Sequence, residues 1–203
     1  VDLEVAIPDA PTPLVARAYA LDLPGMGAMM GGADPTDATI LTLAPGGAAR
    51  EVVLPPPTAR VDLRDATVAR RRTIRMTGAM GGMEGMEGMH GGHGDDATGM
   101  TFVFDGRDFD PDRVDQEVAI GDVEEWVLSN MSPMSHPFHL HTWPMQLMES
   151  PDGAVDVRDV VDVPAMSQVT VRIAFARHPG TTVYHCHILD HEDLGMMGVI
   201  AAS

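Results

Sequence analysis

The sequence predicts an all-β chain whose larger part is a Greek-key β-sandwich or barrel. Short runs of β-favouring residues recur from about Val68 to the end of the chain, and Gly, Pro and Asp residues typical of turns separate them. Upstream, Pro55-Pro56-Pro57 favours a stiff extended connector. We therefore expect 1–54 to be the carboxyl-terminal part of a preceding β-domain, 55–66 to be a Pro-rich linker, and 67–203 to be a second β-domain.

Individual strands are expected where apolar and β-branched residues gather between turn signals. In the first part these runs are 1–7, 14–21, 38–43 and 51–54. In the second part they are 71–76, 101–104, 116–120, 123–130, 138–142, 145–148, 157–161, 168–175, 181–185 and 198–201. This spacing, with turn signals between the runs, fits a Greek-key β-sandwich or barrel.

Segment 78–99 interrupts this series and combines many glycines with Met80, Met83, Met86 and Met89. Such a composition has little core-forming bulk and high backbone entropy, so we expect a mobile Met/Gly-rich insert in the second domain. Thioethers are soft ligands that suit Cu(I), and the insert is therefore a candidate Cu(I)-binding segment. The alternative is a flexible low-complexity loop that arose by expansion of a Met-Glu-Gly unit.

The chain is strongly acidic, with a formal net charge of −17, and all of its 13 basic residues are Arg. This charge argues against nucleic acid or an anionic membrane surface as a partner. We also find no apolar run long enough to span a membrane. Cationic substrates, copper ions included, would be attracted, although an acidic surface also serves solubility alone.

The most informative stretch is 184–197 (YHCHILDHEDLGMM), which holds the single cysteine, three histidines and two methionines. Upstream, 136–141 (HPFHLH) adds three more histidines. Thiolate, imidazole and a weak axial thioether form the ligand set of a blue-copper site. A lone buried cysteine is usually a small hydrophobe, but that reading leaves the grouped histidines unexplained. Zinc is disfavoured because structural zinc sites use several Cys or Cys/His pairs.

Strand geometry sorts these ligands into two sets, because successive side chains point to opposite faces of a strand. If 184–187 is extended, His185 and His187 point one way and Cys186 the other. The same parity places His139 and His141 together. One face then offers His136, Cys186, His191 and Met196, and the other offers His139, His141, His185 and His187. We therefore expect two metal sites that are linked covalently, because Cys186 of one site is the sequence neighbour of His185 and His187 of the other.

These motifs resemble those of multicopper oxidases, in particular the bacterial laccase-like and cuprous oxidase branch. The matching segments are 101–111 (TFVFDGRDFDP), 123–130 (VEEWVLSN), 136–141 and 185–196. The resemblance covers at least 101–200. It implies that the copper-binding domain is a cupredoxin-like Greek-key β-barrel, preceded by the end of another cupredoxin-like domain.

The resemblance also implies the cofactor and the role of each ligand. Copper would occupy type 1, type 2 and type 3 sites in the complete enzyme. The type 1 ligands would be His136, Cys186, His191 and axial Met196. The type 2 copper would be bound by His139, and the type 3 pair by His141, His185 and His187. Glu192 would be a catalytic residue that relays protons to dioxygen, the alternative being a solvated loop acid.

The resemblance implies that this sequence carries half of the ligands of a trinuclear copper cluster. In the family, two further His-x-His motifs of an amino-terminal domain complete the cluster, but no histidine precedes His90 here. The expected partner is therefore that amino-terminal domain or a partner chain, and without it we expect the chain to be inactive. The resemblance implies a periplasmic or extracellular location.

The sequence thus predicts the carboxyl-terminal region of an enzyme that oxidises Cu(I), phenols or aromatic amines at type 1 copper and reduces dioxygen to water at the cluster. Ser132 stands where cuprous oxidases often have an Asp that helps to hold substrate copper, which argues against strict cuprous oxidase specificity. Two alternatives remain. A copper nitrite reductase-like protein would leave His187 idle, and a single-copper electron-transfer cupredoxin would leave the whole second ligand set unused.

Overall fold

The computed structural model describes residues 10–17, 36–44, 46, 60–80, 100–151 and 153–203. The chain divides into two compact units, Val1–Ala59 and Arg60–Ser203. Among the described residues, no helix has the length and apolar character needed to cross a membrane.

The described part of the first unit is an antiparallel strand pair, β1 (Thr12–Ala16) and β2 (Ala38–Leu43). Most of its side chains are exposed. An ion pair of 2.8 Å joins Arg17 to Asp37 beyond the strand ends. The expected strands 1–7 and 51–54 lie outside the described residues.

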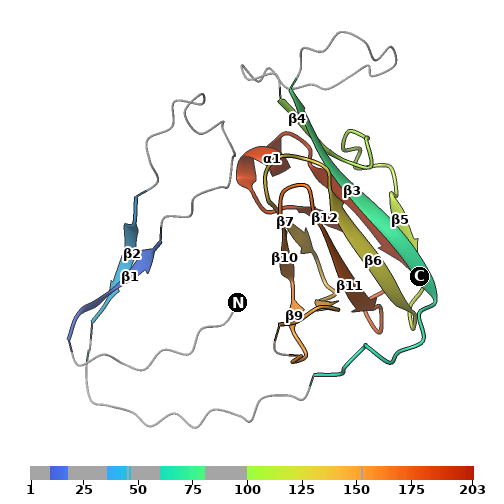
Figure 1. Cartoon of the computed structure of the whole chain (residues 1–203), viewed down its shortest axis with the longest axis horizontal. Coiled ribbons are helices and arrows are strands. Elements are labelled where there is room, and N and C mark those ends of the chain that lie inside the picture. The colour runs from blue at the N-terminus through green and yellow to red at the C-terminus, as the bar shows by residue number, and fades with distance from the viewer. Residues whose placement is uncertain (1–9, 18–35, 45, 47–59, 81–99, 152) are drawn as a thin grey trace. The chain divides into compact units, whose positions relative to one another are not determined.

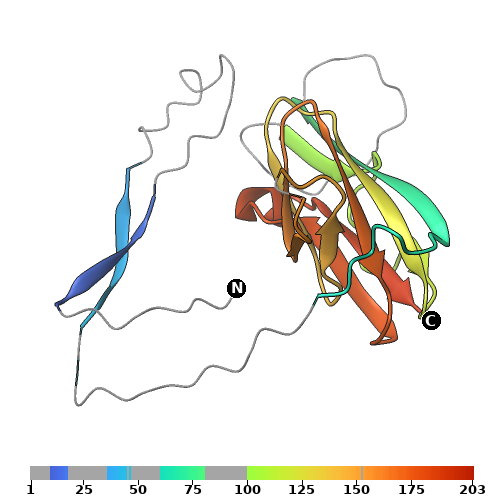
Figure 2. The same ribbon diagram turned by 60° about the horizontal axis from the view of Figure 1, so that its bottom comes forward.

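The second unit contains two β-sheets that form the two layers seen in Figure 1, and the turned view of Figure 2 shows the same layers. The first sheet has the order β10-β7-β12-β13-β5, with β10 (Val160–Val163), β7 (His136–Leu140), β12 (Gly180–Cys186), β13 (Met197–Ala202) and β5 (Gln116–Val118). The second has the order β4-β3-β6-β11-β8-β9, with β4 (Met100–Phe104), β3 (Arg70–Met80), β6 (Val123–Asn130), β11 (Gln168–Ala174), β8 (Met145–Leu147) and β9 (Val157–Arg158).

The prediction of an all-β fold is confirmed, since strands make up nearly all of the regular structure that is described. The exception is a short helix, α1 (Leu189–Asp193), which the sequence analysis did not anticipate. Several strand bounds also differ from expectation. β7 ends at Leu140, so His141 lies beyond the strand although the expected run was 138–142. The expected run 157–161 is split into β9 and β10 at Asp159, and β3 continues to Met80. Residues 78–80 of the expected insert are therefore strand, while 81–99 lie outside the described residues.

The core lies between the two sheets, and β6 shows why the sequence folds this way. Along β6 buried and partly exposed residues alternate without a break, so that Trp126 and Leu128 face the core. Full burial of such side chains stabilises the fold by about 1.5–3 kcal/mol each. Glu124 is also buried, but it accepts a hydrogen bond of 2.8 Å from the indole of Trp126 and pairs with Arg72 at 2.6 Å. Its charge is thereby compensated.

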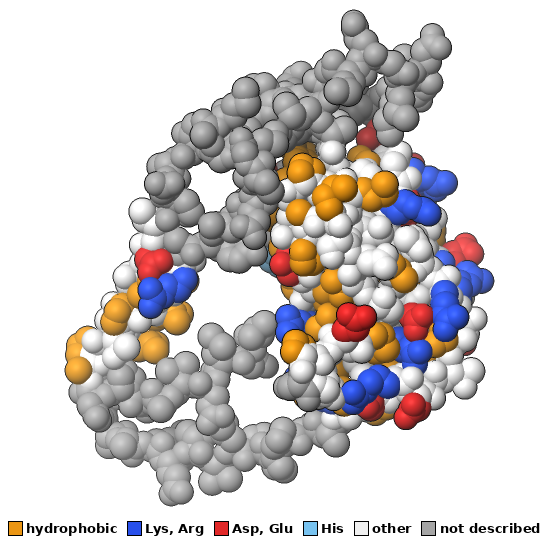
Figure 3. All heavy atoms as spheres, in the orientation of Figure 1, with side chains coloured by type: hydrophobic (Ala, Val, Ile, Leu, Met, Phe, Trp, Pro, Cys, Tyr) orange, Lys and Arg blue, Asp and Glu red, His pale blue; other side chains and the backbone are white. Residues whose placement is uncertain are grey.

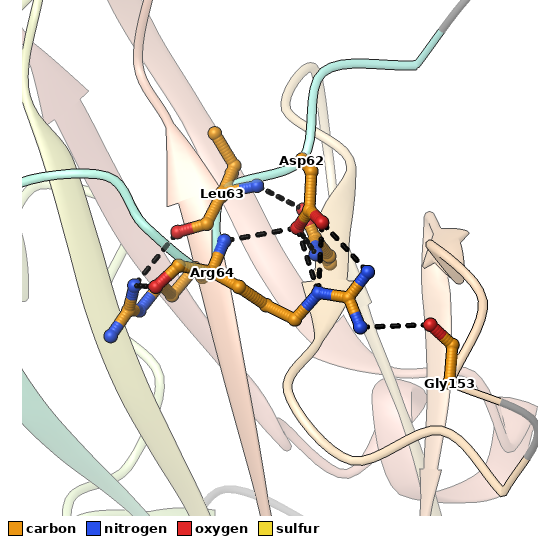
Figure 4. A network of polar contacts seen from close by, with 6 residues as sticks. Asp62, Leu63, Arg64 and Gly153 are labelled. Carbon is orange, nitrogen blue, oxygen red and sulfur yellow. Dashed lines mark hydrogen bonds and ion pairs between the residues drawn. The ribbon is translucent and has the colours of Figure 1, made fainter.

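Residues just before β3 are held on the second unit by a network of polar contacts (Figure 4). The backbone N–H of Leu63 donates to the side chain of Gln146 at 2.7 Å, and Arg172 donates to the carbonyl of Leu63 at 2.7 Å. Asp62 pairs with Arg64, whose guanidinium also donates to the carbonyl of Gly153 at 2.8 Å. Leu63, in the expected linker 55–66, thus contacts Gln146 of β8 and Arg172 of β11.

Charged side chains on the visible face of the second unit are mixed in sign, with Arg beside Asp or Glu in several places (Figure 3). Ion pairs of the second unit include Arg71–Glu125, Arg172–Glu125 and Arg158–Asp156. Arg71, Arg172 and Glu125 come from adjacent strands, which places opposite charges side by side on the outer surface of the sheet. The net acidity of the chain therefore does not amount to an unbroken acidic surface on this face.

Candidate metal centre

Three buried side chains from separate elements meet at one end of the first sheet. His136 begins β7, Cys186 ends β12 and His191 lies in α1. One nitrogen of each imidazole and the thiol sulfur all lie within 4.8 Å of one another. Cys186 Sγ is 3.6 Å from His136 Nδ1 and 3.4 Å from His191 Nδ1, and the two Nδ1 atoms are 3.2 Å apart. All three residues are at least 96% buried.

The backbone brings Met196 next to this group. The N–H of Met196 donates to the carbonyl of His191 at 2.8 Å, and the N–H of Cys186 donates to the carbonyl of Met196 at 3.1 Å. The chain turns back through Gly195, whose φ of +93° is a conformation that favours glycine. The Met196 side chain is fully buried in the hydrophobic core. Three of the four residues expected to bind one metal, Cys186, His191 and Met196, are thus joined by backbone hydrogen bonds.

A second group of imidazoles contains His139, His141 and His185, whose nearest nitrogens also lie within 4.8 Å of one another. His141 Nε2 and His185 Nε2 are 3.0 Å apart. His139 Nδ1 contacts the carbonyl of Asp159 at 2.8 Å, which fixes the orientation of its ring. His187 is exposed and lies outside the three-residue group, although its ring centroid is 5.5 Å from that of His139.

The register of β7 and β12 separates the two groups. His185 is the cross-strand partner of His139, and Cys186 is the partner of Phe138. Because adjacent positions face opposite sides of a sheet, Cys186 points into the core with Phe138 while His185 and His139 point outward. Consecutive residues of one strand therefore serve the two groups.

Ser132 supports His136 from outside the ligand group. Its hydroxyl lies 2.7 Å from His136 Nε2 and is fully buried. The same hydroxyl contacts the side-chain oxygen of Asn130 at 2.9 Å and the carbonyl of Met134 at 3.0 Å. When Nε2 carries the proton and donates it to Ser132, Nδ1 keeps a free lone pair directed at Cys186. Sequence analysis missed this contact, which the four-residue spacing of Ser132 and His136 in a tight turn could have suggested.

Phe102 of β4 was also missed. Its ring stacks on His191 with a centroid distance of 3.7 Å and an interplanar angle of 20°, and it meets His136 edge-on at 6.0 Å. The contact joins residues far apart in the sequence, so no local pattern reveals it. Phe102 thus covers the first group on the side of the second sheet.

Glu192 contacts the second group. Its carboxylate lies 3.2 Å from His185 Nδ1, and its side chain is 30% exposed. A carboxylate in this position orients the ring so that Nε2 faces His141. Partial exposure also leaves the carboxylate able to exchange protons with water.

Burial determines the protonation of the first group in the metal-free protein. Desolvation lowers the pKa of His136 to about 4, with a further contribution from His191, and desolvation also lowers the pKa of His191 to about 4. Desolvation raises the pKa of the Cys186 thiol to about 11. Two neutral imidazoles beside a displaceable thiol proton suit a metal ion, whose binding takes the place of that proton. The donor set, with one soft thiol and Met196 adjacent, fits copper.

Comparisons with known proteins agree with this chemistry. The family model of multicopper oxidases matches residues 86–203. Multicopper oxidase mco of Staphylococcus aureus is 38% identical over 105 residues, which is 47% of this chain and 23% of the relative. A laccase of Haloferax volcanii is 34% identical over 86 residues, which is 38% of this chain and 15% of the relative.

Among solved structures, the multicopper oxidase of Campylobacter jejuni, described as a metallo-oxidase, superimposes with a TM-score of 0.63 and 28% identity. The match covers 96% of this chain and 42% of that protein. The expectation of a cupredoxin-like fold is thereby confirmed. The chain spans about a quarter or less of the length of the curated relatives named above. From the match of more than half of its residues, the chain belongs to the multicopper oxidase family, and its cofactor is copper.

Proposed function

We propose that this chain is the carboxyl-terminal region of an enzyme that oxidises a small reductant one electron at a time and reduces dioxygen to water. The observation that carries the proposal is the adjacency of Cys186 and His185 in β12. Each belongs to a different ligand group, yet one peptide unit joins them. An isolated electron-transfer site has no use for the second group, and this favours coupled sites over a single-copper carrier.

The two groups are assigned as follows. His136, Cys186, His191 and Met196 would hold the type 1 copper. His139 would bind the type 2 copper, and His141, His185 and His187 would bind the type 3 pair. When bound, copper supplies one-electron redox chemistry at the first site and dioxygen reduction at the second.

The protein side chains fix this arrangement. Ser132 directs the imidazole of His136, and the core around Cys186 excludes water from the thiol. We assign to Glu192 the role of holding a proton near the second group, because its carboxylate touches His185 and reaches solvent.

An amino-terminal domain of the same enzyme, or a partner chain, is proposed to supply the remaining imidazoles of the trinuclear cluster. The described residues contain one outward-facing histidine group, formed by His139, His141 and His185, with His187 beside it. His139 and His141 are partly exposed and His187 is exposed. The isolated chain is therefore expected to be inactive toward dioxygen.

The reductant is proposed to be Cu(I), a phenol or an aromatic amine, and the location to be periplasmic or extracellular. The net charge of −17 favours a cationic reductant. The same charge disfavours nucleic acid or an anionic membrane as a partner. Fractionation of the source cells, with this chain detected by antibody, tests the location.

The decisive experiment uses the complete enzyme loaded with copper. The parent should show an intense blue thiolate-to-copper absorption and consume dioxygen, and Cys186→Ser should lose both. Copper content distinguishes the alternatives, because a full complement of type 1, type 2 and type 3 copper contradicts both the nitrite reductase-like and the single-copper readings. A parent without the blue absorption would contradict the proposal itself.

A further inference from the structure

Phe102 of β4 contacts the first ligand group, and Gly78 of β3 lies beside the Phe102 ring. Gly78 and Phe102 are cross-strand partners. The Phe102 ring stacks on His191 at a centroid distance of 3.7 Å. A Cβ atom added at Gly78 would lie 3.0 Å from Cδ1 and from Cε1 of the same ring.

The lack of space for a side chain, and not the backbone conformation, explains why residue 78 is glycine. Gly78 lies within β3 and has no positive φ, so other residues could adopt its backbone angles. A distance of 3.0 Å is well inside normal carbon–carbon contact, so any side chain here would push the ring away from its present place. Gly78 therefore leaves room for the Phe102 ring at its present place.

The ring position in turn restrains His191. The imidazole and the phenyl ring are nearly parallel, with 20° between their planes, so rotation of His191 would require Phe102 to move. The edge of Phe102 also faces His136 at a ring distance of 6.0 Å. Phe102 is 7% exposed and His191 is 4% exposed, which leaves little room for water between the two strands and the imidazoles.

We propose that Phe102 is a positioning residue for the type 1 copper, that it fixes the plane of His191 and keeps water from it, and that Gly78 provides the space for this contact. The inference rests on the proposed function, since it concerns the site where the reductant is oxidised. A dry, apolar surrounding disfavours the more highly charged cupric state, so Phe102 should raise the reduction potential of the site.

The test uses the complete, copper-loaded enzyme and the variants Phe102→Leu and Phe102→Ala. We expect the reduction potential to fall, the thiolate-to-copper absorption to shift or broaden, and copper loss to a chelator to become faster, within the range of about 10- to 100-fold typical of groups that support metal ligands. Phe104→Leu is the matched control. Phe104 is also a buried aromatic residue of β4, but it packs on Phe138 and Tyr184. The Phe104→Leu substitution should leave the thiolate-to-copper absorption unchanged.

Gly78→Ala tests the second half of the inference. It should perturb the same absorption in the parent, and perturb it less in the Phe102→Leu background, because a flexible leucine can yield to the added methyl group. A crystal structure of metal-free Phe102→Leu gives a readout without copper and should show a rotated or multiply placed His191 ring. If Phe102→Ala does not fold, the leucine variant still decides the matter.

The possible failures can be told apart. A parent that binds no copper at the thiolate contradicts the proposed function, and the positioning role falls with it. A parent with normal blue absorption, whose Phe102→Leu variant matches Phe104→Leu in potential, absorption and copper retention, contradicts the positioning role alone.

Discussion

The carboxylate of Glu192 lies 3.2 Å from Nδ1 of His185, so the residue that directly follows His191 of the first ligand group touches the second group in space. His191 and Glu192 are neighbours in α1, yet they serve different ligand groups. The short helix thus links the two groups a second time, in addition to the link through Cys186.

Replacing Glu192 should separate proton supply from electron entry. We expect Glu192→Gln, which keeps the shape but loses the titratable carboxyl, to slow dioxygen reduction by about 10²- to 10⁴-fold, the usual contribution of a general acid. Blue absorption should stay unchanged because the first group is untouched. The measurement is the rate at which the anaerobically reduced enzyme is reoxidised by dioxygen. Asp193→Asn, an exposed neighbour, is the control and should reoxidise like the parent.

Removal of the Ser132 hydroxyl should weaken the first site. Ser132→Ala takes away the acceptor that lies 2.7 Å from His136 Nε2, so the imidazole becomes a poorer donor and copper affinity should fall by about 10- to 100-fold. The reduction potential of the first site should rise, because the cupric state depends more on the basicity of the imidazole ligand than the cuprous state does. Redox titration and copper competition measure both effects. Ser132→Thr keeps a hydroxyl and should restore parental values; failure of this rescue would argue for a purely steric role.

Gly198→Ala should destabilise the fold strongly. A Cβ atom there would lie 2.3 Å from Cζ of Tyr184, whose side chain is buried, so the added methyl group forces the ring or the strand to move. Overpacking of this kind typically costs about 1–3 kcal/mol or more. Urea denaturation measures the change. In a Tyr184→Leu background the same substitution should cost less, and equal costs in both backgrounds would contradict the steric explanation.

Asp62 should make the packing of residues 60–66 sensitive to acid. Hydrogen bonds from Arg64 and then from Gln146 hold the pKa of Asp62 well below its usual range. A lowered carboxyl pKa contributes stability above the pKa of the unfolded chain, about 3.9, and this contribution is lost as the pH falls toward the folded-state value. Denaturation midpoints of the parent and of Asp62→Asn should therefore differ by a constant amount from pH 8 to about 5 and converge below about pH 4. A difference that grows on acidification would contradict the assignment.

Local patterns in the sequence were sufficient to predict most strands. The expected run 123–130 coincides with β6 because buried Trp126 and Leu128 alternate with more exposed neighbours. Parity likewise predicted that Cys186 and His185 face opposite sides. The helix α1 was missed because its five residues give no helical period to detect. Contacts such as Phe102 with His191 depend on how the two sheets pack, which a strand pattern does not encode.

The pairing of His185 with His139 restricts how this protein can diverge. Side-chain direction reverses at every position of a strand, so inserting or deleting one residue within β12 would send Cys186 outward and His185 inward. The same change within β7 would exchange the directions of Phe138 and His139. No intermediate register preserves either ligand group. Divergent relatives should therefore differ at these two strands by substitution only, while length changes accumulate in the connecting loops. A library of single-residue deletions, scored for blue colonies, would show the same asymmetry directly.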